Sequence, residues 1–143
     1  MITTIEIANH QKSIPISPSS TIRKIKKILV SLDASQAKLS IVFVTDRKIH
    51  ALNKQYLNHD YPTDVLAFDM SEKKGRGIIE GEIIVSATTA RRNAKEYRMS
   101  PEQELFLYVI HGVLHLLGYD DHSVSGRNKM RKKEKEIIAL VEG

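Results

Sequence analysis

The chain has 143 residues, which suits a single domain because domains usually contain roughly 100 to 150 residues. It has no cysteine, so disulfides, thiolate nucleophiles and cysteine zinc sites are excluded, and any metal must bind to His, Asp or Glu. The net charge of +5 favours an anionic partner such as nucleic acid.

The first third of the chain predicts a strand, a helix and a second strand. The isoleucines of residues 2–7 suggest the first strand. Ser17 followed by Pro18 resembles a helix cap with proline in the first turn. A helical stripe follows, formed by Ile22, Ile25, Leu29 and Leu32. The β-branched and aromatic run from Leu39 to Val44 predicts the second strand.

The middle of the chain predicts a second helix and two more strands. Asp46 is the expected cap of a helix, which carries Ile49, Leu52 and Tyr56. A turn follows at Asn58–Pro62. Val65–Phe68 and Ile78–Val85 are the next two predicted strands. The polar, glycine-bearing segment Ser71–Gly77 between them favours a hairpin turn.

The last third predicts three helices. The first spans about Ala87–Arg98. A capping box, formed by Ser100, Pro101 and Gln103, opens a strongly apolar helix that ends at Gly118. A basic helix from about Gly126 to Val141 closes the chain. This order predicts one α+β domain over residues 1–143, with a mixed sheet of about four strands packed with helices and the apolar helix at its centre.

Two features of the sequence bear on the location of the protein. The segment Met1–Ala8 lacks the basic stretch and long apolar core of a signal peptide. No apolar run is long enough to cross a bilayer. We therefore expect a cytoplasmic protein with no membrane partner.

His111 and His115 are the strongest candidates for chemistry. They lie four residues apart in the apolar helix, so both side chains project from one face and can chelate one divalent ion. Histidines in apolar surroundings need partners because unsatisfied buried polar groups are costly. The alternative is a pair of core histidines bonded to backbone or carboxylate groups.

The turn after this helix offers a third ligand. Gly118 suits the left-handed conformation that ends a helix, and Asp121 and His122 follow shortly. Three protein ligands would leave the fourth tetrahedral position for water, as in catalytic zinc sites. Position 112 is glycine, whereas thermolysin-like and metzincin peptidases have their glutamate base there, so a peptidase of that design is disfavoured. Gly112 leaves either open space beside the metal or room for close helix packing.

The segment 111–122, His-Gly-Val-Leu-His-Leu-Leu-Gly-Tyr-Asp-Asp-His, resembles the His-Gly-x-Leu-His-Leu-x-Gly-Tyr-Asp-His hallmark of the YbeY endoribonucleases, also called rRNA maturation factors. Residues 52–56, Leu-Asn-Lys-Gln-Tyr, and 62–68, Pro-Thr-Asp-Val-Leu-Ala-Phe, are similar to two further blocks of that family. Residues 81–86, Gly-Glu-Ile-Ile-Val-Ser, resemble its Gly-Asp-Ile-x-Ile-Ser strand.

The resemblance implies a function. A family member would hold one zinc ion per chain through three side chains, with His111 and His115 as catalytic metal ligands. It would be a single-strand-directed endoribonuclease that matures the 3′ end of 16S rRNA and takes part in ribosome quality control. Its partner would be RNA, chiefly rRNA of the small ribosomal subunit. It would not be expected to bind DNA.

The sequence departs from the family pattern at two places. The family's third histidine aligns with Asp121, and His122 comes one residue late, so either residue is a possible third ligand. Leu57 stands where the family has an arginine suited to phosphate binding. Other cations would then have to bind RNA, and the candidates are Lys54, Arg91 and Arg92.

Two functional hypotheses follow. In the first, a metal ion lowers the pKa of a bound water and polarises a phosphodiester of RNA held by the basic clusters Arg23–Lys27 and Arg127–Lys135. In the alternative, the metal only stabilises the fold, and the protein is a ribosome-associated RNA-binding protein with little or no catalysis.

Overall fold

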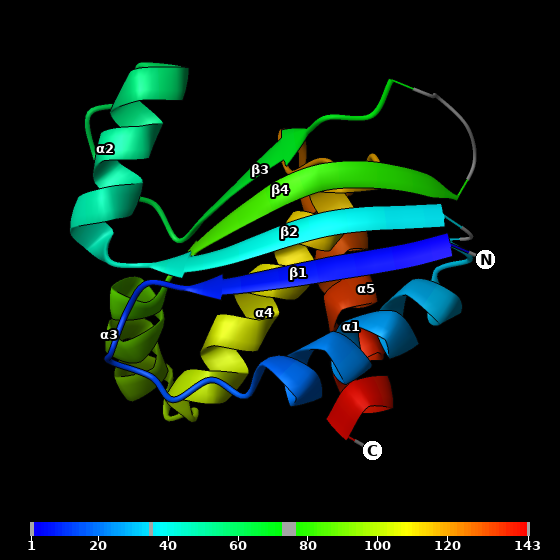
Figure 1. The fold of residues 1–143 in the computed structure, drawn as a ribbon, viewed down its shortest axis with the longest axis horizontal. Coiled ribbons are helices and arrows are strands. Elements are labelled where there is room, and N and C mark those ends of the chain that lie inside the picture. The colour runs from blue at the N-terminus through cyan, green and yellow to red at the C-terminus, as the bar shows by residue number, and fades with distance from the viewer. Residues whose placement is uncertain (1, 35, 73–76, 143) are drawn as a thin grey trace.

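The computed structural model describes residues 2–34, 36–72 and 77–142, which form one four-stranded mixed sheet and five helices (Figure 1). In chain order the elements are β1 (Ile2–Asn9), α1 (Pro18–Ser31), β2 (Gln36–Val44), α2 (Asp46–Leu57), β3 (Val65–Asp69), β4 (Ile78–Ser86), α3 (Ala87–Tyr97), α4 (Pro101–Leu116) and α5 (Val124–Glu142). The predicted α+β fold is confirmed. Among these described helices, none is both long enough and apolar enough to cross a membrane.

The sheet has the strand order β1-β2-β4-β3. β1, β2 and β4 run parallel, since a connection containing a helix separates each from the next. β3 runs antiparallel to β4 at the edge, as expected of two strands joined by a short connection. The hairpin expected around Ser71–Gly77 is therefore present, although residues 73–76 of its turn lie outside the described residues.

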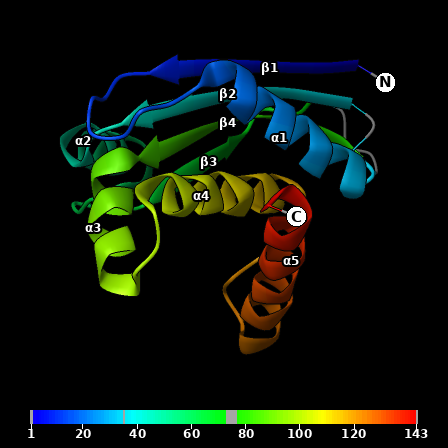
Figure 2. The same cartoon turned by 90° about the horizontal axis from the view of Figure 1, so that it is seen from below.

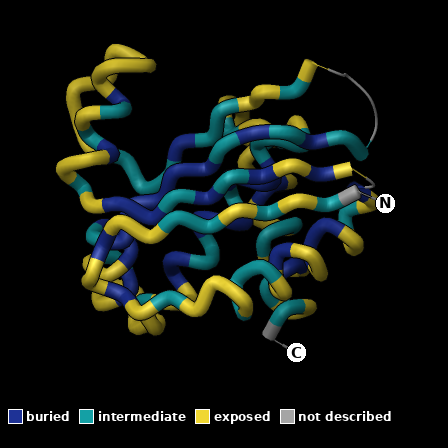
Figure 3. Tube along the Cα trace, viewed as in Figure 1, coloured by how far each residue is buried: buried dark blue, intermediate teal, exposed yellow. Residues whose placement is uncertain are grey.

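The two faces of the sheet are covered unequally. α1, α3 and α4 pack on one face, and α5 lies against α1 and α4 (Figure 2). Alternate residues of β2, such as Leu39 and Ile41, point into this main core. α2 lies at one end of the opposite face, where Ile49 clusters with Val44 and Ile84. Buried residues accordingly run along the middle of the sheet, whereas α2 is mostly exposed (Figure 3).

The helix starts follow local sequence, with one exception. Ser17 caps α1, and Ser100 and Gln103 form the predicted capping box of α4. The expected cap at Asp46 is wrong, because Thr45 caps α2 by accepting a hydrogen bond from the Lys48 backbone N–H. Asp46 is instead the first helical residue, and its carboxylate accepts hydrogen bonds from residues at the start of α3.

Gly112 lets α4 pack closely on the sheet. A Cβ at this position would lie 2.7 Å from Cγ2 of Ile83, a fully buried β4 residue. The space beside Gly112 is thus filled by the sheet, and close helix packing is the interpretation that the structure supports. This contact fixes the depth at which α4 presents its two histidines.

We expect Gly112→Ala to lower the free energy of unfolding by about 1–2 kcal/mol. Overpacking a core typically costs about 1–3 kcal/mol, and the better helix propensity of alanine offsets at most about 1 kcal/mol of that. Denaturant unfolding measures the loss. In an Ile83→Ala background, which removes the obstructing methyl groups, the same substitution should be neutral or stabilising. An equally stable Gly112→Ala protein in the native background would contradict this account.

Candidate metal centre

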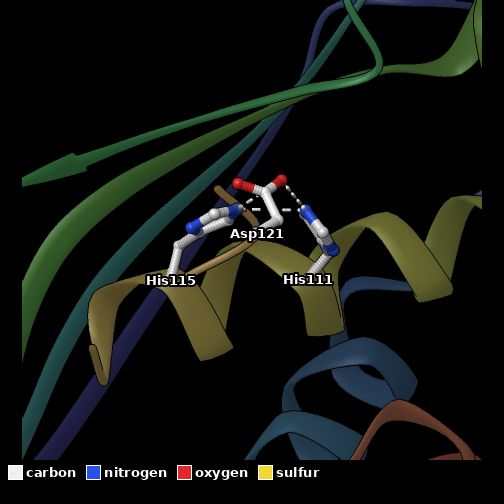
Figure 4. Close-up of side chains that lie close together, drawn as sticks. All are labelled: His111, His115 and Asp121. Carbon is white, nitrogen blue, oxygen red and sulfur yellow. Dashed lines mark hydrogen bonds and ion pairs between the residues drawn. The ribbon is translucent and has the colours of Figure 1, made fainter. Parts of the chain in front are cut away.

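α4 and the loop after it bring three side chains together. His111 and His115 project from the second half of α4, one helical turn apart. Gly118 then adopts a φ of 98°, which reverses the chain, and the Tyr119 backbone N–H donates to the Leu114 carbonyl at 3.0 Å. The loop returns over the helix, so that Asp121 lies between the two histidines (Figure 4).

The separations among the three side chains suit a metal ion. Nε2 of His111 lies 3.0 Å from Nε2 of His115, and each lies 3.7 Å from Oδ2 of Asp121. Tetrahedral zinc with ligands at about 2.0–2.2 Å places neighbouring ligand atoms about 3.3 Å apart. Two imidazoles and one carboxylate are also donors that zinc accepts. The group could therefore hold a metal ion.

The structure distinguishes the two residues considered as the third ligand. Asp121 belongs to the converging group, whereas His122 is exposed and does not. Asp120 fixes this arrangement, because its side chain accepts a hydrogen bond from the His122 backbone N–H at 3.0 Å in an Asx-turn. The turn is also held from α5, where Arg127 donates to the Asp121 carbonyl at 3.3 Å. Asp121 is therefore the candidate third ligand that lies close to His111 and His115.

The two histidines have opposite pKa shifts. Burial works to lower the pKa of His111, but the hydrogen bond and negative charge of Glu134 outweigh it and raise that pKa. Burial and the neighbouring charge of His111 lower the pKa of His115. A metal ligand must be a neutral imidazole, so a metal ion would have to compete with a proton for His111 rather than for His115.

Glu134 was not anticipated as part of the site. Its Oε1 lies 2.7 Å from Nδ1 of His111, although the two residues are on different helices. The sequence did contain a signal. Glu134 falls at helical spacing between Met130 and Ile137, so the apolar stripe of α5 has a carboxylate within it.

The cations predicted to bind RNA are not gathered around the histidines. Arg91 and Arg92 belong to α3, which lies beside the start of α4, whereas the histidines are in its second half (Figure 2). Nη1 of Arg92 is 3.0 Å from Oδ2 of Asp46. Nζ of Lys54 on α2 is 4.0 Å from an Asp60 carboxylate oxygen. Arg91 is exposed. Their role in binding RNA stays a prediction.

The network around Arg92 predicts a pH-dependent contribution to stability. Partial burial works to raise the pKa of Asp46, but hydrogen bonds from Ser86, Thr89 and Arg92 outweigh it and hold that pKa below its ordinary value of 3.8. A lowered pKa in the folded state means that the stabilisation is present above the ordinary pKa. It is lost as the pH falls through the folded-state pKa.

We therefore expect Asp46→Asn to cost about 1 kcal/mol of unfolding free energy near pH 7, since the isosteric amide keeps acceptor capacity but loses the charge. Denaturant unfolding at neutral and acidic pH checks this, and the difference from the native chain should shrink in acid. Glu96→Gln, at an exposed α3 position, is the control. A cost that persists unchanged in acid would show that ionisation of Asp46 is not its origin.

Known proteins with similar sequences point to the same family as the residues around the candidate metal centre. The family model of the endoribonuclease YbeY matches residues 6–142. The endoribonuclease YbeY of Syntrophus aciditrophicus is 34% identical over 148 residues, covering 100% of this chain and 92% of the relative. That of Chloroherpeton thalassium is 39% identical over 125 residues, covering 87% of this chain and 86% of the relative.

A solved structure also matches. A Thermotoga maritima protein with a known solution structure superposes with a TM-score of 0.70 at 30% sequence identity, covering 96% of this chain and 89% of that one. The resemblance found in the sequence is therefore confirmed over almost the whole chain. With its His-His-Asp group on the expected helix and turn, this chain belongs to the endoribonuclease YbeY family.

Proposed function

We propose that this protein is a zinc-dependent endoribonuclease that cleaves single-stranded RNA. Its proposed role is in the maturation of ribosomal RNA at the 3′ end of 16S rRNA, and in ribosome quality control, in the cytoplasm. The convergence of His111, His115 and Asp121 in a chain of this family is the observation that carries the proposal. The proposal includes one zinc ion per chain and a single domain over residues 1–143.

The three side chains would hold a metal ion where it can act on a phosphodiester. When bound, a divalent ion supplies Lewis acidity and lowers the pKa of a coordinated water. Two neutral imidazoles and one carboxylate cancel only part of the charge of such an ion, so the site stays positive towards RNA. Three protein ligands also leave a fourth position open, as in catalytic zinc sites. The alternative of a purely structural metal is not favoured, because the relatives are named endoribonucleases.

Basic helices provide a surface for the rest of the RNA. α1 and α5 pack together through Ile28, Met130 and Ile137. Their outer faces have exposed cations, which are Arg23, Lys24, Lys26, Lys27, Arg127, Lys129, Arg131, Lys132 and Lys135. We propose that these side chains, with Lys54, Arg91 and Arg92, contact phosphates and give a salt-dependent affinity that does not depend on sequence.

Cleavage of a circular single-stranded RNA tests the function, because only an endonuclease can linearise a circle. We expect the zinc-loaded protein to linearise it, a chelator to stop cleavage, and added zinc to restore it. A duplex RNA and a single-stranded DNA of the same sequence serve as substrate controls and should remain uncut. A zinc-loaded protein that binds the circle but leaves it intact would favour the RNA-binding alternative.

A further inference from the structure

α5 places a carboxylate in an apolar interface. Met130 and Ile137, on either side of Glu134 in the helical stripe, are each 2% exposed and pack with Ile110 and Leu114 of α4. The Glu134 side chain is itself only 15% exposed. A carboxylate in such surroundings is costly unless it is paired, so its position requires a compensating contact.

His111 supplies that contact. Oε1 of Glu134 lies 2.7 Å from Nδ1 of His111, a length typical of a charge-assisted hydrogen bond. An ionised carboxylate can only accept, so Nδ1 must carry the proton. The lone pair of neutral His111 is then on Nε2, the atom that faces His115 and Asp121. The contact with Glu134 thus selects the tautomer that can bind a metal.

We propose that Glu134 is a positioning residue that holds the His111 ring in the tautomer and orientation required for metal binding. The inference rests on one part of the proposed function, which is that His111, His115 and Asp121 bind a metal ion. A carboxylate behind a ligating histidine fixes the ring and raises its basicity, and losing such a partner typically costs about 10–100-fold in metal affinity. The last helix is thereby part of the metal site, although it contributes no ligand.

Glu136 provides a matched control. It lies on the same helix and has the same charge, but its side chain is 53% exposed and its carboxylate is 3.3 Å from Nζ of Lys133. Glu136→Gln therefore makes the same change in net charge without touching His111. Glu134→Gln keeps the side-chain shape and an acceptor oxygen but loses the charge, and Glu134→Ala removes the contact altogether.

The experiment measures zinc affinity by competition with a chromophoric chelator, on full-length chains whose folding is checked by circular dichroism. We expect Glu134→Ala to weaken zinc binding about 10–100-fold, Glu134→Gln to weaken it less, and Glu136→Gln to match the native chain. If Glu134→Ala does not fold, a weakened affinity in Glu134→Gln alone supports the proposal. Unchanged affinity in the folded Glu134 variants overturns it.

The tautomer of His111 is a second readout, because a general loss of fold stability in the variant would not by itself move the proton from one ring nitrogen to the other. Nitrogen-15 NMR of the metal-free protein should show the proton of neutral His111 on Nδ1, moving to Nε2 in the Glu134→Ala protein, which has no acceptor at that place. A native chain that binds zinc but cleaves no RNA would refute the proposed function and leave the role of Glu134 standing. A native chain that binds no zinc would overturn the role of Glu134 itself.

Discussion

His115→Ala should abolish zinc binding and RNA cleavage together. Among the described residues, His115 provides one of three converging ligand atoms, and its Nε2 lies 3.0 Å from that of His111. Loss of a group behind a ligand already costs about 10–100-fold in metal affinity, so loss of a ligand should cost more than about 100-fold. Elemental analysis of the purified variant and the circular-RNA assay measure the two effects. His111→Ala should behave in the same way.

The fold should survive this substitution, since the His115 side chain is 30% exposed and is not part of the fully buried interior. His50→Ala is a suitable control, because His50 is paired with Asp60 on the exposed side of α2, away from α4. That variant should retain zinc and activity. Full zinc content and full cleavage in the His115→Ala protein would refute the metal site.

Asp121→Ala should remove zinc, and His122→Ala should not. Oδ2 of Asp121 lies 3.7 Å from Nε2 of both histidines, while His122 is exposed outside the group. We expect an affinity loss of more than about 100-fold in the first variant and none in the second, measured by chelator competition. Asp121→His, which restores the residue of the family pattern, should retain zinc.

The opposite result would have a definite meaning. Loss of zinc in His122→Ala, with zinc retained in Asp121→Ala, would show that the turn rearranges on metal binding and that Asp120 does not fix it. Asp121→Asn separates charge from geometry, because its amide oxygen occupies a similar place without the negative charge. We expect it to bind zinc less tightly than the native chain, but more tightly than Asp121→Ala.

The fold was largely predictable because its signals are local. The apolar stripe and the cap of α4 lie within one helix, and the polar segment between β3 and β4 indicated their hairpin. The cap of α2 was predicted wrongly because the partners of Asp46 are distant in sequence. Its carboxylate accepts hydrogen bonds from Ser86 and Thr89, about which the residues around Asp46 contain no information.

The site was predictable to the same extent. The spacing of His111 and His115 follows from helix geometry alone. The choice between Asp121 and His122 depends on the conformation of the turn, because a shift of one position along it changes which side chain faces α4. The sequence alone did not decide between the two residues. Glu134 comes from another helix, so only its unusual place in an apolar stripe pointed to it.

The three proposed ligands and Glu134 all lie within residues 111–134, on two successive helices and their loop. The sheet, in contrast, must pair residues 2–9 with 36–44, and residues 36–44 with 78–86. Closing a short loop costs little entropy, so an unfolded chain can bring the same histidines near one another before the sheet exists. We therefore expect a zinc ion to bind the unfolded chain as well, though more weakly than the folded site. Excess zinc should consequently stabilise the native protein by less than its affinity for the folded site alone would give.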